Sequence, residues 1–342
     1  MDKLRIGVIG TGKIAEVLHV PNIVSSEFAE VVALSNPHEE KMKRLAEKYG
    51  LNVPMFTDYR ELLKIQEVDA VVVATPNVFH ASISIDALKA GKHVLVEKPM
   101  ATTSEEALKM IETAKEMSKV LMVNHSQRFF PHHQKAKEIV DSGILGEIRL
   151  VKTMFGHPGP ENWSPSAAWF FDKERAMFGA LGDLGVHKVD LIRYLTGLEI
   201  TECYAFANTL EKKGTVEDIA SAVMKLSNGA LATLNVNWVT KGLEENYIAI
   251  YGENGTMKVG YSDPNRIDLY LSKPVNFHGF IELQPLFTNE DPYWKMPIID
   301  HFAKVCLGLE KPVVDPYDGY IAVKVIEKMV ESFEKRQAMK VE

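Results

Sequence analysis

Short apolar runs alternate with helical patterns over the first third of the chain. The runs Leu4–Ile9, Val31–Leu34, Ala70–Ala74, His93–Val96 and Val120–Asn124 are almost continuously apolar, which is typical of parallel strands covered on both faces. Amphipathic stretches between them predict helices, and Thr103 with Glu106 predicts a capping box at the start of one helix. This alternation predicts an α/β fold with a doubly wound parallel sheet.

The pattern changes after Gly146, where apolar and polar residues alternate along several strand-like segments. Such alternation predicts a mostly antiparallel sheet with one face on a core. A helix is predicted from Asp183 to Leu195, with Gly197 just past its end. Two more helices are predicted near residues 296–307 and 317–336, so this part is expected to be α+β. The expected strands are Ile148–Phe155, Cys203–Thr209, Ile219–Leu226, Leu231–Trp238, Tyr247–Tyr251 and Ile267–Leu271.

A glycine-rich turn follows the first strand and opens a stretch with helical spacing. In such a unit the first glycine allows a tight turn, the second lets a pyrophosphate approach the backbone, and a small third residue lets the helix pack on the strand. Free N–H groups at the helix start face the phosphates. A dinucleotide site is therefore predicted, although glycines of this spacing also occur in plain turns. Its expected residues are Gly10, Thr11, Gly12, Lys13 and Ile14.

Ser35 and Asn36 end the second strand, where an acidic residue would bind the ribose hydroxyls and disfavour a 2′-phosphate. Both residues are neutral. Lys13, His38 and Lys41 are near enough in sequence to supply positive charge. These residues are therefore compatible with both NADP and NAD, and they favour NADP slightly.

Polar residues also follow the later strands. In doubly wound sheets the ligand lies across the carboxyl ends of the strands, so these residues are expected to bind the cofactor. They are Thr75, Pro76, Asn77, His80, Glu97, Lys98 and Asn124. Arg128 follows the last of these strands, and we expect it to contact cofactor or substrate, with an ordered domain connection as the alternative.

Composition and charge narrow the class of protein. The 342 residues are 46% hydrophobic and 25% charged with a net charge of −7, which is typical of a soluble globular protein and argues against a nucleic-acid or membrane-surface binder. No apolar run approaches the roughly 20 residues of a membrane helix.

Two cysteines suit neither a disulfide framework nor a zinc site, and no signal peptide precedes the first strand, so a cytoplasmic protein is expected. No acidic or cysteine partner accompanies His125, His132 and His133, and no metal is expected.

Three motifs occur together in this chain: the G-x-G-x-x-A turn, E-K-P after the strand H-V-L-V, and D-x-x-x-H from Asp183 to His187. With them the chain resembles the Gfo/Idh/MocA family of oxidoreductases over essentially its whole length. The resemblance implies an NAD(P)-binding Rossmann domain over residues 1–124. It also implies a C-terminal α+β domain over residues 125–342 that binds the substrate and forms a homodimer or homotetramer through its open sheet.

The same resemblance implies hydride transfer between the nicotinamide and a secondary alcohol or ketone of a sugar, polyol or sugar derivative. It places Lys98, Asp183 and His187 together at the nicotinamide as catalytic and substrate-binding residues, and it implies a cis Lys98–Pro99 bond. Two other activities occur on this fold: an NAD-dependent redox glycosidase, and a sensor of nucleotide or sugar without turnover.

The chemistry of these residue types suits that reaction. A base must take the proton of the hydroxyl, and the pKa of histidine lies near working pH. His187 is therefore expected to be the acid–base group, with Asp183 or Asp190 orienting it from the same helix face. Lys98 is expected to hold the substrate oxygen and stabilise its developing charge. Without these motifs, His187 reads equally well as a core histidine and Asp183 as a helix N-cap.

A loop rich in proline and aromatic residues runs between Gly156 and Trp169. Long loops on rigid scaffolds often bind ligands, and indole faces suit the apolar faces of sugar rings. His157, Trp163 and Trp169 are therefore expected at the substrate site together with Arg128. Ordinary packing of the tryptophans is the alternative.

Overall fold

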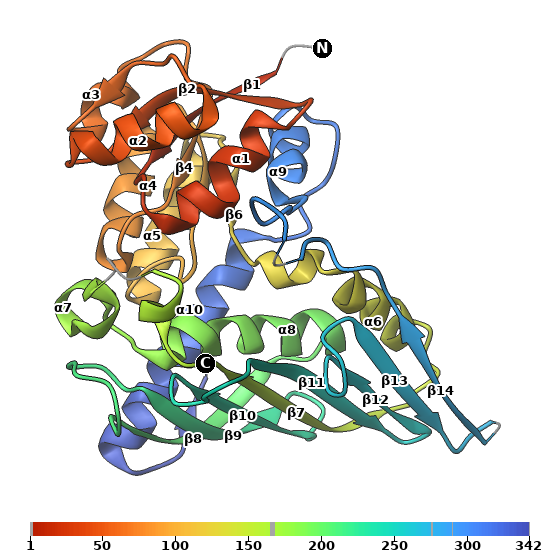
Figure 1. The fold of residues 1–342 in the computed structure, drawn as a ribbon. Coiled ribbons are helices and arrows are strands. Elements are labelled where there is room, and N and C mark those ends of the chain that lie inside the picture. The colour runs from red at the N-terminus through yellow and green to blue at the C-terminus, as the bar shows by residue number, and fades with distance from the viewer. Residues whose placement is uncertain (1–2, 165–167, 275, 289, 342) are drawn as a thin grey trace. The chain divides into compact units, whose positions relative to one another are not determined.

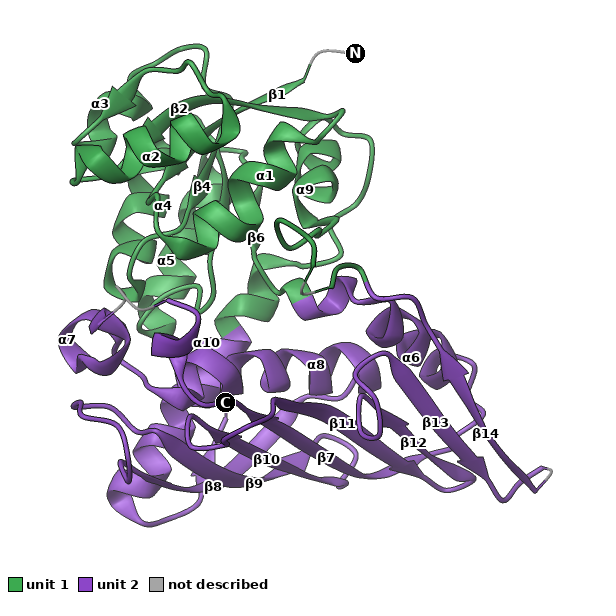
Figure 2. Cartoon of the chain, in the orientation of Figure 1, with its two compact units in different colours: residues 1–126, 286–320 green, residues 127–285, 321–342 purple. Residues whose placement is uncertain are grey.

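The computed structural model describes residues 3–164, 168–274, 276–288 and 290–341, which form two compact units (Figures 1 and 2). The first unit consists of residues 1–126 and 286–320, and the second of residues 127–285 and 321–342. The segment carrying α9 (Ile298–Cys306) thus belongs to the first unit, although it follows most of the second in sequence. That residues 1–124 form the cofactor-binding domain and residues 125–342 the substrate-binding domain stays a prediction.

The first unit contains a six-stranded sheet in the order β3-β2-β1-β4-β5-β6, with every neighbouring pair parallel. The residues of β4 and the last three of β5 are buried, as the continuous apolar runs predicted for strands covered on both faces. The doubly wound parallel sheet is therefore confirmed. Its strands are β1 (Leu4–Ile9), β2 (Ala29–Ser35), β3 (Met55–Phe56), β4 (Ala70–Val73), β5 (His93–Val96) and β6 (Leu121–Val123). The unit's helices include α1 (Val20–Val24), α2 (Glu39–Tyr49), α3 (Tyr59–Leu63), α4 (His80–Lys89) and α5 (Ser104–Glu116).

The strand order reverses between β1 and β4, and their carboxyl ends lie at one edge of the sheet. Backbone pairing continues one residue past the strands, since Ala74 donates to the Ile9 carbonyl and Glu97 to the Val73 carbonyl. Asn124 continues the series by donating to the Val96 carbonyl. The turns after four successive strands of the sheet are thus held side by side, at the place where doubly wound sheets bind their ligands.

The local signals at two helix ends are borne out, although one half of the predicted capping box is made with a neighbouring residue. The backbone N–H of Glu106 donates to Thr103 Oγ1 at 3.1 Å, as the capping box predicts. The Glu106 carboxylate, however, accepts from Thr102 rather than from Thr103. In the second unit Gly197 ends its helix with φ 68°, in the left-handed region that favours glycine.

The second unit contains a nine-stranded sheet in the order β14-β13-β12-β11-β7-β10-β9-β8-β15 (Figure 1). The pair β7–β10 is parallel, and the other neighbouring pairs are antiparallel, which confirms the predicted, mostly antiparallel sheet. Its strands are β7 (Ile148–Gly156), β8 (Ile200–Asn208), β9 (Ile219–Leu226), β10 (Leu231–Asn237), β11 (Glu245–Gly252), β12 (Gly255–Val259), β13 (Arg266–Leu271), β14 (Phe277–Glu282) and β15 (Met339–Lys340). The helices α6 (Pro131–Asp141), α7 (Lys173–Ala176), α8 (Val186–Thr196) and most of α10 (Pro316–Lys335) belong to this unit.

One face of this sheet packs under α8, while the other carries exposed apolar side chains. Along β9, Ala222 and Met224 are buried and Val223 between them is 51% exposed. The strand register places Phe206 of β8 and Leu231 of β10 on the same face as Val223, and both are exposed. Oligomerisation through this face stays a prediction.

Even α10, with 20 residues, has charged side chains along its length. Among the described parts of the chain, no helix combines the length and apolar character that crossing a membrane requires.

Candidate functional site

The candidate residues divide between the two units, and the glycine-rich turn of the first unit has the geometry that its sequence predicted. Gly10 has φ +94°, and a Cβ at this residue would lie 2.3 Å from the Ala74 carbonyl oxygen, so only glycine fits. At Gly12, by contrast, a Cβ would meet no atom of the described residues within 4 Å. Ala15 is fully buried at the start of the π turn that leads into α1. The turn therefore packs tightly against the strand end at Gly10, whereas no described residue fills the space beside Gly12.

Buried polar atoms without a hydrogen-bond partner gather around the ends of these strands and the first helix. Within the described residues they are Thr11 Oγ1, His19 Nδ1, Thr75 Oγ1 and Asn124 Oδ1. An unpaired buried polar atom costs about 1–3 kcal/mol, so several together indicate a site that a ligand completes. A dinucleotide has hydroxyl, phosphate and amide groups to pair with them. The residues present therefore fit the predicted cofactor.

A buried hydrogen-bond network holds the turn that carries Lys98. Glu97 Oε1 lies 2.6 Å from His19 Nε2 and accepts from Asn124 Nδ2 at 2.6 Å, and Glu97 Oε2 accepts from the Lys98 N–H at 3.2 Å. Burial alone would raise the pKa of Glu97, but the hydrogen bond from His19, together with Asn124 and the charge of Lys98, holds that pKa below its usual value. Sequence reasoning did not find His19, which ends the π turn Ala15–His19 before α1. Its only signal was a histidine four residues after Ala15 in the stretch with helical spacing.

The turn after β5 is fixed from a second side by His80. The two ring nitrogens of His80 lie 2.8 Å from the carbonyl oxygens of Pro99 and Thr75, so the ring joins the turns after β4 and β5. The Lys98–Pro99 bond is cis, as the family resemblance implied, and Lys98 is half-buried. In these contacts His80 holds the turns together, and its predicted contact with a cofactor stays a prediction.

Several residues that are expected to select the cofactor already form hydrogen bonds or ion pairs within the protein. Ser35 is buried, and its carbonyl accepts from the Gly10 N–H. Asn36 Oδ1 accepts from the His38 N–H at 2.9 Å. Lys13 Nζ lies 3.9 Å from Glu16 Oε1, so the nearest predicted cation already faces a carboxylate. Pro76 and Ile14 are half-buried, while Asn77 is buried where a short helix (Asn77–Phe79) begins.

Asp183 and His187 lie on consecutive turns of one helical segment in the second unit, and both are buried. The helix predicted from Asp183 to Leu195 is confirmed, and the structure adds that it begins with a π turn, Leu181–Gly185, which leads into α8 at Val186. The turn packs closely, because a Cβ at Gly182 would lie 2.5 Å from Phe178 Cβ. Asp183 is inside the helical segment, so it is not the N-cap that was the alternative to a functional role.

The side chain of Asp183 faces groups from two strands. Trp238 Nε1, just after β10, donates to Asp183 Oδ2 at 3.1 Å, and His157 Nε2, just after β7, lies 3.8 Å from the same oxygen. The Phe155 ring lies 6.0 Å from the His187 ring, centre to centre. Of the predicted residues, the fold thus brings together Asp183 and His157. Sequence reasoning missed Trp238, whose only signal was its position at the end of a strand.

The predicted tryptophans form an aromatic cluster beside Trp238. Trp169 stacks on Phe170 with ring centres 4.0 Å apart, and Trp163 meets Phe170 edge-on at 5.7 Å. Phe170 in turn lies 6.5 Å from Trp238. The loop expected between Gly156 and Trp169 includes residues 165–167, which lie outside the described residues. The cluster supports either the substrate role or the packing alternative.

Arg128 occupies a different environment from the one expected of a cofactor contact. Its buried guanidinium donates hydrogen bonds from Nε and Nη2 to the carboxylate of Asp190, at 2.6 to 3.1 Å, and lies over the Tyr194 ring. Both partners are almost fully buried, so the pair ties the segment after β6 to α8. This geometry favours the ordered connection that was the alternative for Arg128. Of the neighbouring histidines, His132 and His133 pack ring to ring at 4.3 Å, and burial lowers the pKa of His132 to about 4.

A buried carboxylate holds the start of the segment that carries Asp183. Glu217 Oε1 accepts from the N–H groups of Gly179 at 2.8 Å and Leu181 at 3.0 Å, and the Glu217 carbonyl accepts from Ala180. The backbones approach closely, because a Cβ at Gly179 would lie 1.9 Å from the Glu217 carbonyl oxygen. Burial, opposed in part by these N–H groups, raises the pKa of Glu217 to about 7.

The raised pKa of Glu217 predicts a pH dependence of stability. A carboxyl group with a folded-state pKa above its unfolded value binds its proton more tightly when folded, so its contribution is fully present below about pH 4.5 and is lost as the pH rises to about 7. A glutamine side chain cannot ionise but keeps the accepting oxygen. The free energy of unfolding of Glu217→Gln, relative to that of the wild type, should therefore increase by up to about 3 kcal/mol as the pH is raised from 4.5 to 8. Urea unfolding of both proteins measures this gain, and a difference that does not vary with pH would contradict it.

Comparisons with known proteins agree with this architecture. A family model described as "Oxidoreductase family, NAD-binding Rossmann fold" matches residues 4–125, and a "GFO/IDH/MocA C-terminal domain" model matches residues 133–258. The uncharacterized oxidoreductase YrbE of Bacillus subtilis is 30% identical over 268 residues, which are 77% of this chain and 75% of that protein. Myo-inositol 2-dehydrogenase of Thermotoga maritima is 27% identical over 99% of both chains. The solved structure of a levoglucosan dehydrogenase with NADH and L-sorbose is 25% identical and matches 100% of both chains with a TM-score of 0.86.

Proposed function

The chain belongs to the Gfo/Idh/MocA family of oxidoreductases, and we propose that it transfers a hydride between NAD(H) and a secondary alcohol or ketone of a sugar or polyol. The observation that carries this proposal is the pair Asp183 and His187, buried on consecutive turns of one helical segment with Trp238 and His157 facing the carboxylate. A base on a rigid element beside an oriented carboxylate is what proton removal from a hydroxyl requires.

In the proposed reaction, His187 takes the proton of the substrate hydroxyl during oxidation and returns it during reduction. Asp183 stabilises the positive charge that the imidazole then carries, and the hydrogen bond from Trp238 keeps the carboxylate in place. We assign to Lys98 the stabilisation of negative charge on the substrate oxygen, which the network around Glu97 supports by fixing its backbone. The nicotinamide supplies or accepts the hydride when bound.

The proposed cofactor is NAD(H), held by the open turn at Gly12 and by the unpaired polar atoms of Thr11, Thr75 and Asn124. The family model is that of an NAD-binding domain, and the levoglucosan dehydrogenase was solved with NADH. Lys13 faces Glu16, which weakens the case for a 2′-phosphate at this place. The slight preference for NADP that Ser35 and Asn36 suggested therefore stays a prediction, to be tested against NAD.

The proposed substrate is a compact polyhydroxylated ring. The aromatic cluster of Trp163, Trp169 and Phe170 offers apolar ring faces, while Asp183, His157 and His187 offer hydrogen-bonding groups. A sugar presents both kinds of surface. The relatives that match over nearly the whole chain are named for such compounds, myo-inositol and levoglucosan.

Nicotinamide absorbance at 340 nm, recorded while sugars, polyols and inositols are offered with NAD or NADP, tests the proposal. We expect turnover with NAD and a cyclic polyol. Turnover with NADP alone would restore the preference inferred from the sequence. Release of sugar from a chromogenic glycoside without net change in NADH would instead indicate the redox glycosidase. A bound cofactor with no activity at all would indicate the sensor.

A further inference from the structure

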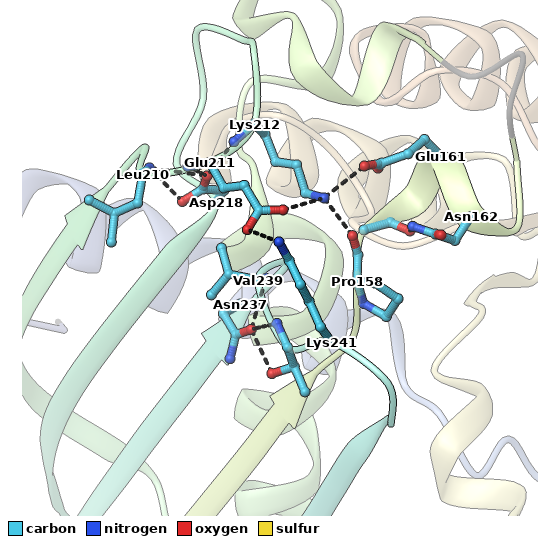
Figure 3. A network of polar contacts seen from close by, with 12 residues as sticks. Pro158, Glu161, Asn162, Leu210, Glu211, Lys212, Asp218, Asn237, Val239 and Lys241 are labelled. Carbon is cyan, nitrogen blue, oxygen red and sulfur yellow. Dashed lines mark hydrogen bonds and ion pairs between the residues drawn. The ribbon is translucent and has the colours of Figure 1, made fainter.

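Lys212, in the loop between β8 and β9, connects that loop to the proline-rich segment after β7 (Figure 3). Its ammonium donates to the Pro158 carbonyl at 2.5 Å and to Glu161 Oε1 at 2.7 Å, and Glu211 Oε1 lies 3.6 Å away. The side chain is only 10% exposed. A nearly buried ammonium is costly without partners, so these contacts determine where the lysine lies.

The loop that carries Lys212 is itself anchored. The fully buried carboxylate of Asp218 accepts from the backbone N–H groups of Leu210, Glu211 and Lys212 at 2.7 to 3.1 Å. The Asp218 backbone also pairs with Asn208 and with Trp238. Lys212 therefore projects from a backbone held directly beside the strand end that positions Trp238.

The segment that Lys212 contacts, residues 156–163, is called the substrate loop below. It begins with His157, whose ring lies 3.8 Å from Asp183, and it ends at Trp163 in the aromatic cluster. Besides Lys212, its described contacts with the sheet include the bond from the His157 N–H to the Asn237 carbonyl at 3.2 Å. Gly159 has φ +115°, and a Cβ there would lie 2.8 Å from Lys212 Nζ, so the loop closes tightly around the ammonium.

We propose that Lys212 is a positioning residue that determines substrate affinity by holding the substrate loop against the β8–β9 loop. The proposal deepens the proposed function and rests on it. Lys212 touches neither Asp183 nor His187 in any described contact, so it acts through His157 and Trp163. Without its ammonium, the Pro158 carbonyl and Glu161 lose their shared donor. The loop is then ordered only when the sugar binds, and this ordering lowers the affinity for the sugar.

The chain offers a matched control in Lys241. Its ammonium lies 3.0 Å from Glu211 Oε2, so it belongs to the same charged group, but it is 70% exposed and contacts Glu211 rather than the substrate loop (Figure 3). The hydrogen bond from Lys241 is also the main reason that the pKa of Glu211 lies below its usual value. A change in overall charge alone would affect Lys212→Met and Lys241→Met alike.

The test compares the wild type with Lys212→Met, Lys212→Arg and Lys241→Met. Methionine keeps the length of the apolar stem, so folding is expected to survive. We expect Lys212→Met to raise the KM for the sugar about tenfold with kcat within about threefold, because hydrogen bonds to charged groups contribute that much and act on bound substrate. Lys212→Arg should restore most of the affinity, and Lys241→Met should leave KM within about twofold. An equal KM for Lys212→Met and Lys241→Met would overturn the proposal.

Amide hydrogen exchange supplies a readout that does not depend on turnover. Asn162 and Trp163 donate backbone hydrogen bonds within the loop, to Gly159 and Pro160. Their exchange should be about tenfold faster in Lys212→Met and unchanged in Lys241→Met. A wild type that turns over no sugar would overturn the proposed function. The exchange data then still decide whether Lys212 holds the loop: faster exchange supports it, and equal exchange rejects it.

Discussion

Replacing His187 by alanine is expected to lower turnover about a thousandfold while the affinity for NAD(H) stays within about threefold. The residue lies in the second unit, on α8, whereas the glycine-rich turn and the unpaired polar atoms that fit the cofactor belong to the first. Loss of the imidazole removes the proposed acid–base group and leaves those atoms in place. Steady-state kinetics and fluorescence titration with NADH measure the two quantities separately.

The control for this variant is His278→Ala, which removes an exposed histidine of β14 in the same unit. It should change neither kcat nor cofactor affinity by more than about twofold, as expected for a surface substitution. If His187→Ala weakened NADH binding as much as it lowered turnover, His187 would be a cofactor contact and not the base.

The second large effect is expected at the first glycine of the turn. Gly10→Ala should lower the free energy of unfolding by about 3 kcal/mol and abolish measurable binding of NADH. The added Cβ would lie 2.3 Å from the Ala74 carbonyl oxygen, and φ at +94° is strained for alanine. The clash is with backbone, so a side-chain rotation cannot relieve it. Urea unfolding of the wild type and the variant measures the loss of stability.

The same substitution two residues later separates folding from binding. At Gly12 a Cβ would meet no atom of the described residues within 4 Å, so Gly12→Ala should keep its stability within about 1 kcal/mol. We expect it nevertheless to weaken NADH binding at least tenfold, because the methyl group would occupy the space through which a pyrophosphate approaches. Full affinity in Gly12→Ala would place the phosphates elsewhere and remove the argument for this turn as the cofactor site.

Much of the fold could be predicted from the sequence because its signals are local. The continuous apolar runs at Ala70–Ala74 and His93–Val96 correspond to buried parallel strands, and alternation along Ile219–Leu226 corresponds to a strand with one buried face. Parallel strands end at the same edge of a sheet, so the placement of Thr75, Glu97 and Asn124 at successive strand ends followed from the strand assignment alone. The left-handed conformations of Gly10 and Gly197 also follow from local backbone sterics.

The sequence predicted a helix from Asp183, but it did not show that this helix begins with a π turn. The π turn at Leu181–Gly185 forms where Gly179 and Gly182 allow close contact with the Glu217 backbone and with Phe178. Periodicity alone cannot show this, because a π turn and an α turn place apolar residues in similar patterns over so few positions.

The sequence by itself therefore determined that one sheet is parallel and the other mostly antiparallel, where the glycine-rich turn lies, and which short segments carry the candidate groups. Only the tertiary structure decided which side chains face one another: His19 with Glu97, Trp238 with Asp183, Arg128 with Asp190, and Lys212 with Pro158. Backbone sterics and side-chain periodicity act between near neighbours in the chain and leave a trace in the sequence. The pairing of buried polar groups far apart in sequence is selected by packing and by the cost of leaving them unpaired, and both depend on the completed fold.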